Sequence, residues 1–234
     1  SNGALDKVTR YGISPDGQLT TQDVPVSVKA PAERKLPYHF AGLALNSNGS
    51  RLLVVNNQTS SNTKFQGSAT MFQTETGRRL FEIPTSGFPL ACVMLTRGPL
   101  ADRRAYVASE RDGCLDILDL RAKTRCGTVR VGAAPVGLLL NRKQNLLYCA
   151  NSGSDTVSVL DTTTDRVIRT INLRPAILRG LPGAGPLGLA LSDDEQTLYV
   201  TLGDMEAIAV VQERGGCGRC LRHVVAPFRR VAEL

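Results

Sequence analysis

The sequence has no tryptophan, and phenylalanine and tyrosine together make up only 5% of its 234 residues. It also has only two histidines, His39 and His223. With so few imidazoles we do not expect a catalytic histidine pair, and with so few aromatic rings the chain lacks the stacking surfaces that bind single-stranded nucleic acid. No Gly-x-Ser-x-Gly elbow, Walker loop or His-Glu-x-x-His motif is present. The usual signatures of hydrolases and nucleotide-binding enzymes are therefore missing.

Long apolar runs are missing as well. No stretch of about 18 residues is apolar enough to span a bilayer, so we expect no membrane insertion. The formal charge is +7, from 28 basic and 21 acidic residues, and such a diffuse excess gives little support to a polyanionic partner. The chain does not open on methionine or on a basic region followed by an apolar one. We expect a mature or excised piece whose start hides any export signal.

What the sequence does contain is an internal repeat. The motif Pro-x-Gly-Leu-x-Leu occurs at residues 135–140 and 186–191, and looser copies begin at Phe40 and Pro89. Successive starts lie 49, 46 and 51 residues apart. A period of roughly 40 to 50 residues, with four strands in each repeat, is the sequence signature of a β-propeller.

Alternating and short continuous apolar runs within each repeat favour strands over helices. In the clearest copy the runs are joined by polar turns rich in Asn, Asp, Ser and Gly, which stabilise tight turns. The continuous apolar run at 136–140 predicts an innermost strand buried on both faces. The predicted strands of this copy are residues 136–140, 146–151, 156–161 and 166–173.

The stretch Leu146–Ile171 resembles the YVTN family of β-propeller repeats, in which a Tyr-Val-x-Asn strand precedes a Thr-Val-Ser-Val-Ile-Asp strand. Tyr-Cys-Ala-Asn at 148–151 and Thr-Val-Ser-Val-Leu-Asp at 156–161 carry the likeness. The resemblance extends over about Phe40 to Gln212 and implies a seven-bladed propeller. The motif indicates the fold specifically, but it says little about the function.

A narrower stretch, Gly185–Val211, looks like propellers of bacterial proteins that carry an alkaline-phosphatase-superfamily phosphoesterase domain after the blades. In such proteins the resemblance places metal binding and hydrolysis in the second domain. Nothing after Val211 looks like that domain. The resemblance implies an exported bacterial protein, periplasmic or extracellular, whose full-length form could include a C-terminal hydrolase domain.

We therefore predict an all-β fold: a β-propeller of four-stranded antiparallel blades, with about four complete blades plus a partial one, forming an incomplete ring from a longer seven-bladed propeller. The partial blade is expected to supply a strand at residues 7–11 and another near 19–24. The chain is expected to form a single domain. Its predicted parts are the end of a partial blade at 1–33 and blades at 34–86, 87–132, 133–184 and 185–234, the last with an irregular C-terminal tail.

Candidate binding residues fall mainly on the hairpins between the second and third strands of the repeats. These hairpins would lie at one end of a propeller channel, and the longer loops inserted after residues 56 and 173 are expected to add further binding groups. A solvated rim with no ligand is the alternative. The predicted surface comprises His39, Gln58, Asn62, Lys64, Arg111, Asp112, Asp155, Arg179 and Asp204.

Six cysteines occur, and their spacing alone predicts no disulfide framework. Cys92 and Cys149 fall inside predicted strands, where cysteine usually acts as a small buried hydrophobe. Cys217, Cys220 and His223 have ligand-like spacing, but a structural zinc site needs four ligands, and no second cluster follows. We keep these three as weak metal candidates and predict no cofactor.

Three functional hypotheses follow. The first is a non-catalytic propeller module that binds a protein or small-molecule ligand, because exchangeable loops on a rigid ring suit binding. The second is a propeller hydrolase of lactonase or phosphoesterase type with a channel-bound metal, although the inner strands are built from Leu, Ala and Gly. The third is single-stranded nucleic-acid binding, which the composition disfavours.

Overall fold

The computed structural model describes residues 8–22, 39–57, 66–174, 183–212 and 226–227. The chain divides into two compact units, unit 1 (Ser1–Thr128) and unit 2 (Val129–Leu234). The described parts of both contain antiparallel strands, with one short 3₁₀ turn, η3 (Gly203–Met205), as the only helical element. None of the described segments forms a helix that is both long and apolar enough to cross a membrane.

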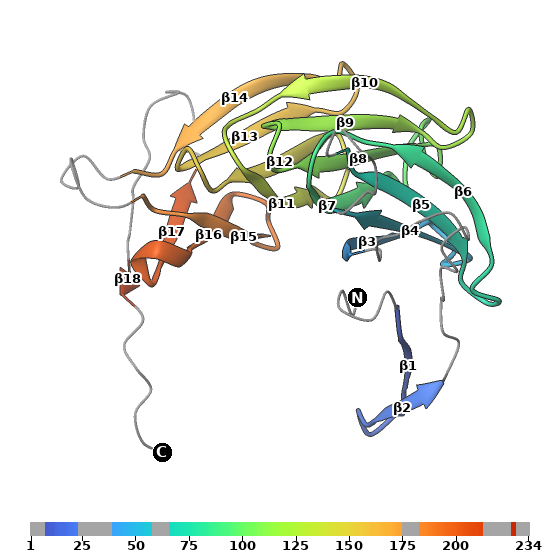
Figure 1. Ribbon diagram of the computed structural model, residues 1–234. Coiled ribbons are helices and arrows are strands. Elements are labelled where there is room, and N and C mark those ends of the chain that lie inside the picture. Colours follow the sequence, from blue (N-terminus) through green and yellow to red (C-terminus); the bar gives the residue numbers. More distant parts are fainter. Residues whose placement is uncertain (1–7, 23–38, 58–65, 175–182, 213–225, 228–234) are drawn as a thin grey trace. The chain divides into compact units, whose positions relative to one another are not determined.

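Unit 1 contains a hairpin and two four-stranded meanders, blade 1 and blade 2 (Figure 1). The hairpin pairs β1 (Arg10–Ile13) with β2 (Leu19–Gln22). Blade 1 consists of β3 (Phe40–Leu45), β4 (Arg51–Asn56), β5 (Ser68–Gln73) and β6 (Arg79–Pro84). Blade 2 consists of β7 (Pro89–Met94), β8 (Arg104–Ser109), β9 (Cys114–Asp119) and β10 (Thr124–Arg130), whose last two residues belong to unit 2.

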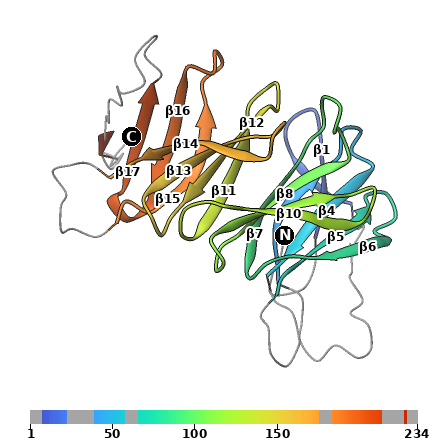
Figure 2. The same ribbon diagram turned by 90° about the horizontal axis from the view of Figure 1, so that it is seen from above.

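Unit 2 contains blades 3 and 4. Blade 3 consists of β11 (Pro135–Leu140), β12 (Leu146–Asn151), β13 (Thr156–Asp161) and β14 (Arg166–Asn172). Blade 4 consists of β15 (Pro186–Leu191), β16 (Thr197–Leu202), β17 (Ala207–Gln212) and the two-residue β18 (Ala226–Pro227). Figure 2 shows β15, β16 and β17 side by side in this last sheet.

The four strands of blade 3 lie where the sequence predicts them, to within a residue. Two expectations are wrong. The first strand of the hairpin begins at Arg10 instead of residue 7. The innermost strand at 136–140 is not buried on both faces, since every residue of β11 after Pro135 is only partly buried; Leu45 on β3 and Leu187 on β15 are 52% and 50% exposed. The first strand lies at the edge of its sheet, whereas the second and third have a neighbour on each side, and it is these that are buried, as β4 and β5 are.

Glycine at the third position of an inner strand allows the next blade of the same unit to approach. A Cβ added to Gly42 on β3 would lie 2.7 Å from the Cα of Ala91 on β7. A Cβ added to Gly137 on β11 would lie 2.2 Å from the carbonyl oxygen of Leu187 on β15. Real Cβ contacts are never so short, so within each unit the repeated Gly sets how closely adjacent inner strands pack.

The turns after the inner strands join neighbouring blades in both units. Asp102, in the turn after β7, accepts the backbone N–H of Ser47 at 2.7 Å and also binds its hydroxyl. Glu195, in the turn after β15, accepts the backbone N–H of Arg142 at 2.5 Å. Both acidic residues have a left-handed backbone, with φ of 57° and 58°. We call these contacts the turn bridges.

In each unit, one cluster of buried apolar side chains lies between its two blades. In unit 1 they include Leu53 and Met71 from blade 1 and Met94 and Leu118 from blade 2. In unit 2 the corresponding cluster includes residues of β13, β16 and β17. Burying apolar surface at roughly 25 cal/mol per Å² makes these interfaces the main stabilising feature of each unit.

Candidate functional site

In each unit, the predicted binding residues that the structure describes lie at the second hairpins or at the segments that enter the blades. His39 precedes β3, Arg111 and Asp112 lie between β8 and β9, Asp155 between β12 and β13, and Asp204 in η3. The other predicted residues, Gln58, Asn62, Lys64 and Arg179, lie outside the described residues, as do Cys217, Cys220 and His223.

In unit 1, Arg111 and Asp112 both hold the segment that enters blade 2. Asp112 Oδ2 accepts the backbone N–H of Gly87 at 2.6 Å, and its Oδ1 accepts from Arg111 Nε at 3.2 Å. The Arg111 guanidinium packs directly on Gly87, where an added Cβ would lie 1.9 Å from Nη2. The side chain of Arg111 is 45% exposed and that of Asp112 is 41% exposed. This pair therefore combines an anchoring role with an accessible face.

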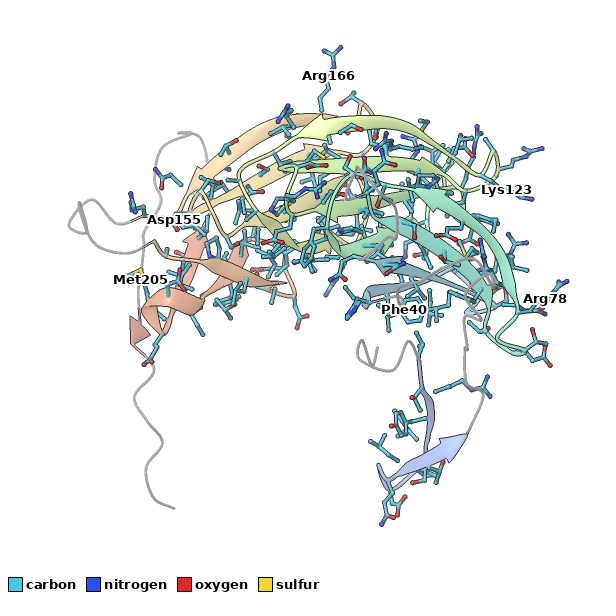
Figure 3. The ribbon with its side chains drawn as sticks, viewed as in Figure 1. Phe40, Arg78, Lys123, Asp155, Arg166 and Met205 are labelled. Atoms are coloured by element: carbon cyan, nitrogen blue, oxygen red, sulfur yellow. The ribbon has the colours of Figure 1, made fainter. Side chains whose placement is uncertain are left out.

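In unit 2, Asp155 holds the segment that enters blade 4. It has a left-handed backbone, φ 54°, and its Oδ1 accepts the backbone N–H of Ala184 at 2.6 Å and of Gly185 at 3.1 Å. Its Oδ2 lies 3.2 Å from Arg174 Nε. The carboxylate of Asp204 also lies beside Gly185, where an added Cβ would be 2.5 Å from its Oδ2. The structure therefore brings Asp155 and Asp204 to the same two-residue segment (Asp155 is labelled in Figure 3).

His39 has a backbone role as well. Its N–H donates to Asn56 Oδ1 at 2.9 Å, and its carbonyl accepts the N–H of Asn57 at 3.0 Å. It stands at the position that precedes the inner strand of blade 1, as Gly87–Phe88 do in blade 2. Whether any of these residues contacts a ligand stays a prediction.

Asp116, in the middle of β9, was not singled out from the sequence, yet it is the most highly coordinated carboxylate described. Its side chain is fully buried and accepts from the Ser86 N–H at 2.7 Å, the Ser86 hydroxyl at 2.8 Å and the Ser109 hydroxyl at 2.8 Å. Arg125 and Thr128 donate at 3.1 and 3.3 Å. The sequence signal that could have identified Asp116 is a charged residue between two apolar residues of a predicted strand, Leu115 and Ile117. The site ties β9, β10 and the connection from blade 1 together.

The cysteine expectations are confirmed where they can be examined. Cys92 and Cys149 are buried and unpaired with another sulfur. Burial raises the pKa of the Cys92 thiol to about 12 and raises the pKa of Cys149 as well. Burial is also the main cause of the raised pKa of Cys114, helped by the charge of Asp116. These thiols are small core side chains and not reactive nucleophiles.

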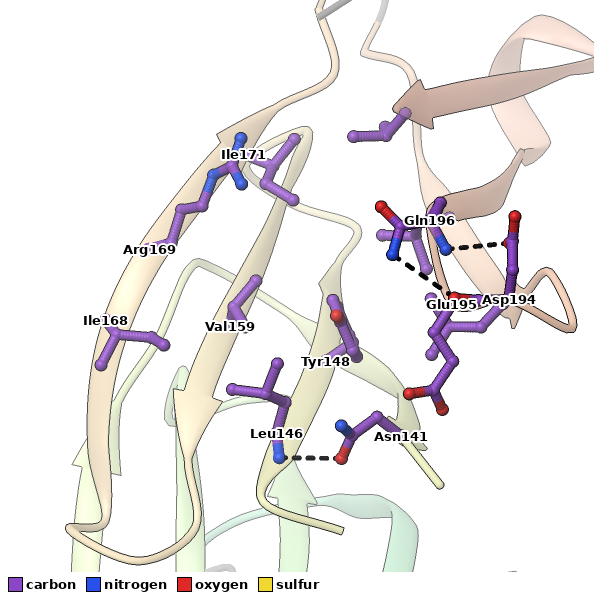
Figure 4. A pocket seen from close by; sticks show the side chains of 13 residues that line it. Asn141, Leu146, Tyr148, Val159, Ile168, Arg169, Ile171, Asp194, Glu195 and Gln196 are labelled. Atoms are coloured by element: carbon purple, nitrogen blue, oxygen red, sulfur yellow. Dashed lines mark hydrogen bonds between the residues drawn. The ribbon is translucent and has the colours of Figure 1, made fainter. Parts of the chain in front are cut away.

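Sequence reasoning also missed a cavity of about 260 Å³ between blades 3 and 4 of unit 2 (Figure 4). One wall comes from β12, β13 and β14 and carries Tyr148, Val159, Ile168 and Arg169. The opposite wall comes from blade 4 and ends in the turn Asp194–Gln196. The other lining residues are Asn141, Leu146, Ile171, Leu191, Leu198 and Val211. Seven of the 13 lining residues are aliphatic, and the rest are Tyr148 and five polar or charged residues, so the site combines apolar walls with several polar groups.

The charged groups at the mouth are fixed by the turn that bears them. Asp194 Oδ1 accepts the Ser192 hydroxyl at 2.5 Å and the Gln196 N–H at 3.1 Å. The Ser192 hydroxyl, and then the Gln196 N–H, hold the pKa of Asp194 below its usual value. Glu195 takes part in the turn bridge to Arg142. The mouth is thus negatively charged on the blade 4 side at neutral pH.

Among the described residues, no group of three or more His, Cys, Asp and Glu side chains converges in a way that could hold a metal ion.

No protein-family model matches the sequence, and no curated protein is similar enough in sequence to count as a relative. Solved structures are similar in fold. They include a periplasmic gluconolactonase of Pseudomonas aeruginosa, at 21% identity and TM-score 0.64 over 95% of this chain and 64% of that one. Virginiamycin B lyase of Staphylococcus aureus matches at 12% identity and TM-score 0.67, over 98% of this chain and 65% of that one.

A third similar structure, hydrazine synthase of Kuenenia stuttgartiensis, has 19% identity and TM-score 0.62 over 80% of this chain and 49% of that one. The chain thus spans about half to two thirds of the length of these structures. At such identities the likeness speaks for the fold alone. The chain has a β-propeller fold with four-stranded antiparallel blades, as the repeat predicted.

Proposed function

We propose that the chain is a non-catalytic β-propeller module that binds a protein or small-molecule ligand within a larger exported bacterial protein. The surfaces proposed for binding are the corresponding edges of the two units, each taken by itself: the one with Arg111 and Asp112 in unit 1 and the one with Asp155 and Asp204 in unit 2. The name of the Pseudomonas neighbour, a periplasmic protein, is in keeping with export. The YVTN likeness of residues 148–151 and 156–161 belongs to the same proposal.

The observation that supports this proposal is the state of the two best-placed carboxylates. Asp112 and Asp155 each accept a backbone N–H at 2.6 Å from the segment entering a blade and each pair with an arginine. A carboxylate that already accepts from a backbone N–H and pairs with an arginine is less suited to take a proton from a substrate. The same contacts make the edge rigid, and a rigid surface loses less entropy when a ligand binds.

The proposal is tested by a screen of purified protein against organic acids, sugars, sugar phosphates and short peptides, followed by thermal shift. A hit should lose at least tenfold in affinity in Arg111→Ala or in Asp204→Ala. Arg166→Ala is the matched control, since Arg166 is exposed on the outer strand of blade 3.

The enzyme alternative is tested with the same variants. The names of two neighbours, a gluconolactonase and a lyase, make a lactonase and esterase panel with added divalent metals the appropriate assay. Turnover by wild-type protein that disappears in Asp155→Ala or Asp204→Ala, while the fold is retained, would overturn the non-catalytic reading. Binding without turnover supports it.

A further inference from the structure

The cavity in unit 2 has a counterpart in unit 1, because the two units repeat the same pairing. In blade 1 the outer strand β6 bulges, with Met71 opposite Phe81 and Phe72 opposite Arg79. In blade 3 the outer strand β14 bulges at the same place, with Val159 opposite Arg169 and Leu160 opposite Val167. A bulge turns two successive side chains toward one face. Leu80 and Phe81 of unit 1 therefore correspond to Ile168 and Arg169 of unit 2.

The remaining lining residues correspond as well. Leu53, Met71, Ile83, Met94, Ala105 and Leu118 of unit 1 stand where Tyr148, Val159, Ile171, Leu191, Leu198 and Val211 stand in unit 2. In unit 1, Leu80 and Phe81 pack against this cluster. The ring of Phe81 thus occupies the place between blades 1 and 2 that is hollow between blades 3 and 4.

Two replacements remove apolar bulk from the unit 2 side of this comparison. Arg169 supplies no ring where Phe81 does, and Val159 is shorter than Met71, although Leu198 and Tyr148 are larger than Ala105 and Leu53. Figure 4 shows Ile168 and Arg169 on β14 and Val159 on β13 along one side, facing the turn that bears Asp194 and Glu195. The space of about 260 Å³ is slightly smaller than typical ligand pockets, which run from about 300 Å³ upward. It suits one ring with a short chain.

The charges in unit 1 and unit 2 indicate what such a ring should carry. In unit 1 the Nζ of Lys123 lies 5.6 Å from the centroid of Phe81, so an ammonium group accompanies the ring. In unit 2 the cavity bears the carboxylates of Asp194 and Glu195 against the single guanidinium of Arg169, so the excess of negative charge at the mouth would attract an ammonium group from outside. The Arg169 guanidinium lines the same cavity and can lie against an aromatic face.

We propose that this cavity binds a free small molecule consisting of a single aromatic ring with a short, protonated amine side chain. The ring enters the place that corresponds to Phe81, between Ile168 and Val159 on one side and Leu198 and Val211 on the other. The amine remains at the mouth beside Asp194 and Glu195. The site lies at the end of the strands opposite to the edge in the proposed function, and it is independent of that edge.

The test uses 2-phenylethylamine as the probe and isothermal titration calorimetry or saturation-transfer NMR on the full chain. We expect saturable binding by wild-type protein, with 2-cyclohexylethylamine and 3-phenylpropionate each at least tenfold weaker. Arg169→Phe introduces the residue that unit 1 has at the corresponding position, Phe81, and its ring should fill the cavity. The affinity for the probe should then fall at least tenfold, while the melting temperature stays the same or rises. Asp194→Asn should weaken the amine several-fold.

Arg166→Phe is the matched control, because it introduces the same ring on the same strand. Figure 3 shows Arg166 pointing away from the sheet, and it is exposed, so this variant should bind as wild type does. If Arg169→Phe fails to fold, Val159→Met fills the same space from β13 and takes its place. The proposal is overturned if wild-type protein shows no saturable binding, if both filled variants bind unchanged, or if the cyclohexyl or carboxylate probe binds equally well.

Discussion

Replacing Asp116 tests whether a buried carboxylate holds unit 1 together. Its five donors come from the connection at Ser86, from Ser109, and from Arg125 and Thr128 on β10. Asp116→Ala leaves these donors without an acceptor. Breaking a buried ion pair by removing one partner costs about 3 to 5 kcal/mol. Because Arg125 is 40% exposed and can be hydrated, we expect a value near the lower end, about 3 kcal/mol.

Asp116→Asn removes the negative charge but keeps nearly the same side-chain shape, so it separates the two contributions to stability. The amide keeps one acceptor oxygen but presents an NH₂ group to donors, so we expect roughly half of the alanine effect, about 1.5 kcal/mol. Urea denaturation measures both, with Glu75→Gln as a control on an exposed acid of the same unit. Hydrogen exchange at the Ser86 amide should accelerate in both variants, since that N–H donates to Asp116. An Asp116→Ala protein within about 0.5 kcal/mol of wild type would refute the reasoning.

Three further predictions concern packing, pH and thiols. Gly137→Ala forces a Cβ toward the Leu187 carbonyl oxygen and should destabilise unit 2 by about 1 to 3 kcal/mol in thermal unfolding, whereas Gly127→Ala, with 3.3 Å to Ile117, should cost far less. The Ala122 N–H lowers the pKa of Asp119, and the Thr163 hydroxyl lowers the pKa of Asp161. A folded-state pKa below the unfolded value of about 3.9 adds to the free energy of unfolding. This contribution is complete above about pH 3.9 and is lost as the pH falls through the folded pKa. Asp119→Asn should therefore weaken the dependence of the free energy of unfolding on pH at the acid end. With Cys217 and Cys220 changed to serine, a thiol reagent should label exposed Cys126 in native protein and reach Cys92 and Cys149 only after unfolding; rapid native labelling of Cys149 would contradict its burial.

The strands of blade 3 could be predicted from the sequence because their signals are local. Alternating apolar residues and Asn, Asp and Gly turns specify β12 at Leu146–Asn151 and β13 at Thr156–Asp161 without reference to the rest of the chain. The burial of Cys92 and Cys149 followed from the same pattern. The fold class rested on the repeat and is confirmed by the solved structures.

The candidate site could not be predicted in the same way, because it depends on residues far apart in the chain. The comparison with unit 1 depends on Arg169 standing where Phe81 stands, and that equivalence depends on a bulge that displaces the register by one residue. The rim residues were placed on the correct hairpins, but the segments that Asp112 and Asp155 hold, at Gly87 and Ala184, could not be identified without tertiary structure.

The turn bridges have a consequence for how such a chain can be rearranged. Each uses a main-chain donor, Ser47 or Arg142, so this hydrogen bond does not depend on the side chain that the preceding blade offers, although Asp102 gains a second bond from the Ser47 hydroxyl. A gene segment encoding one blade could therefore be duplicated or transplanted and still join its new neighbour, provided that the incoming blade has Asp or Glu at the left-handed position. Modular growth of this kind would depend on a single acidic codon per junction.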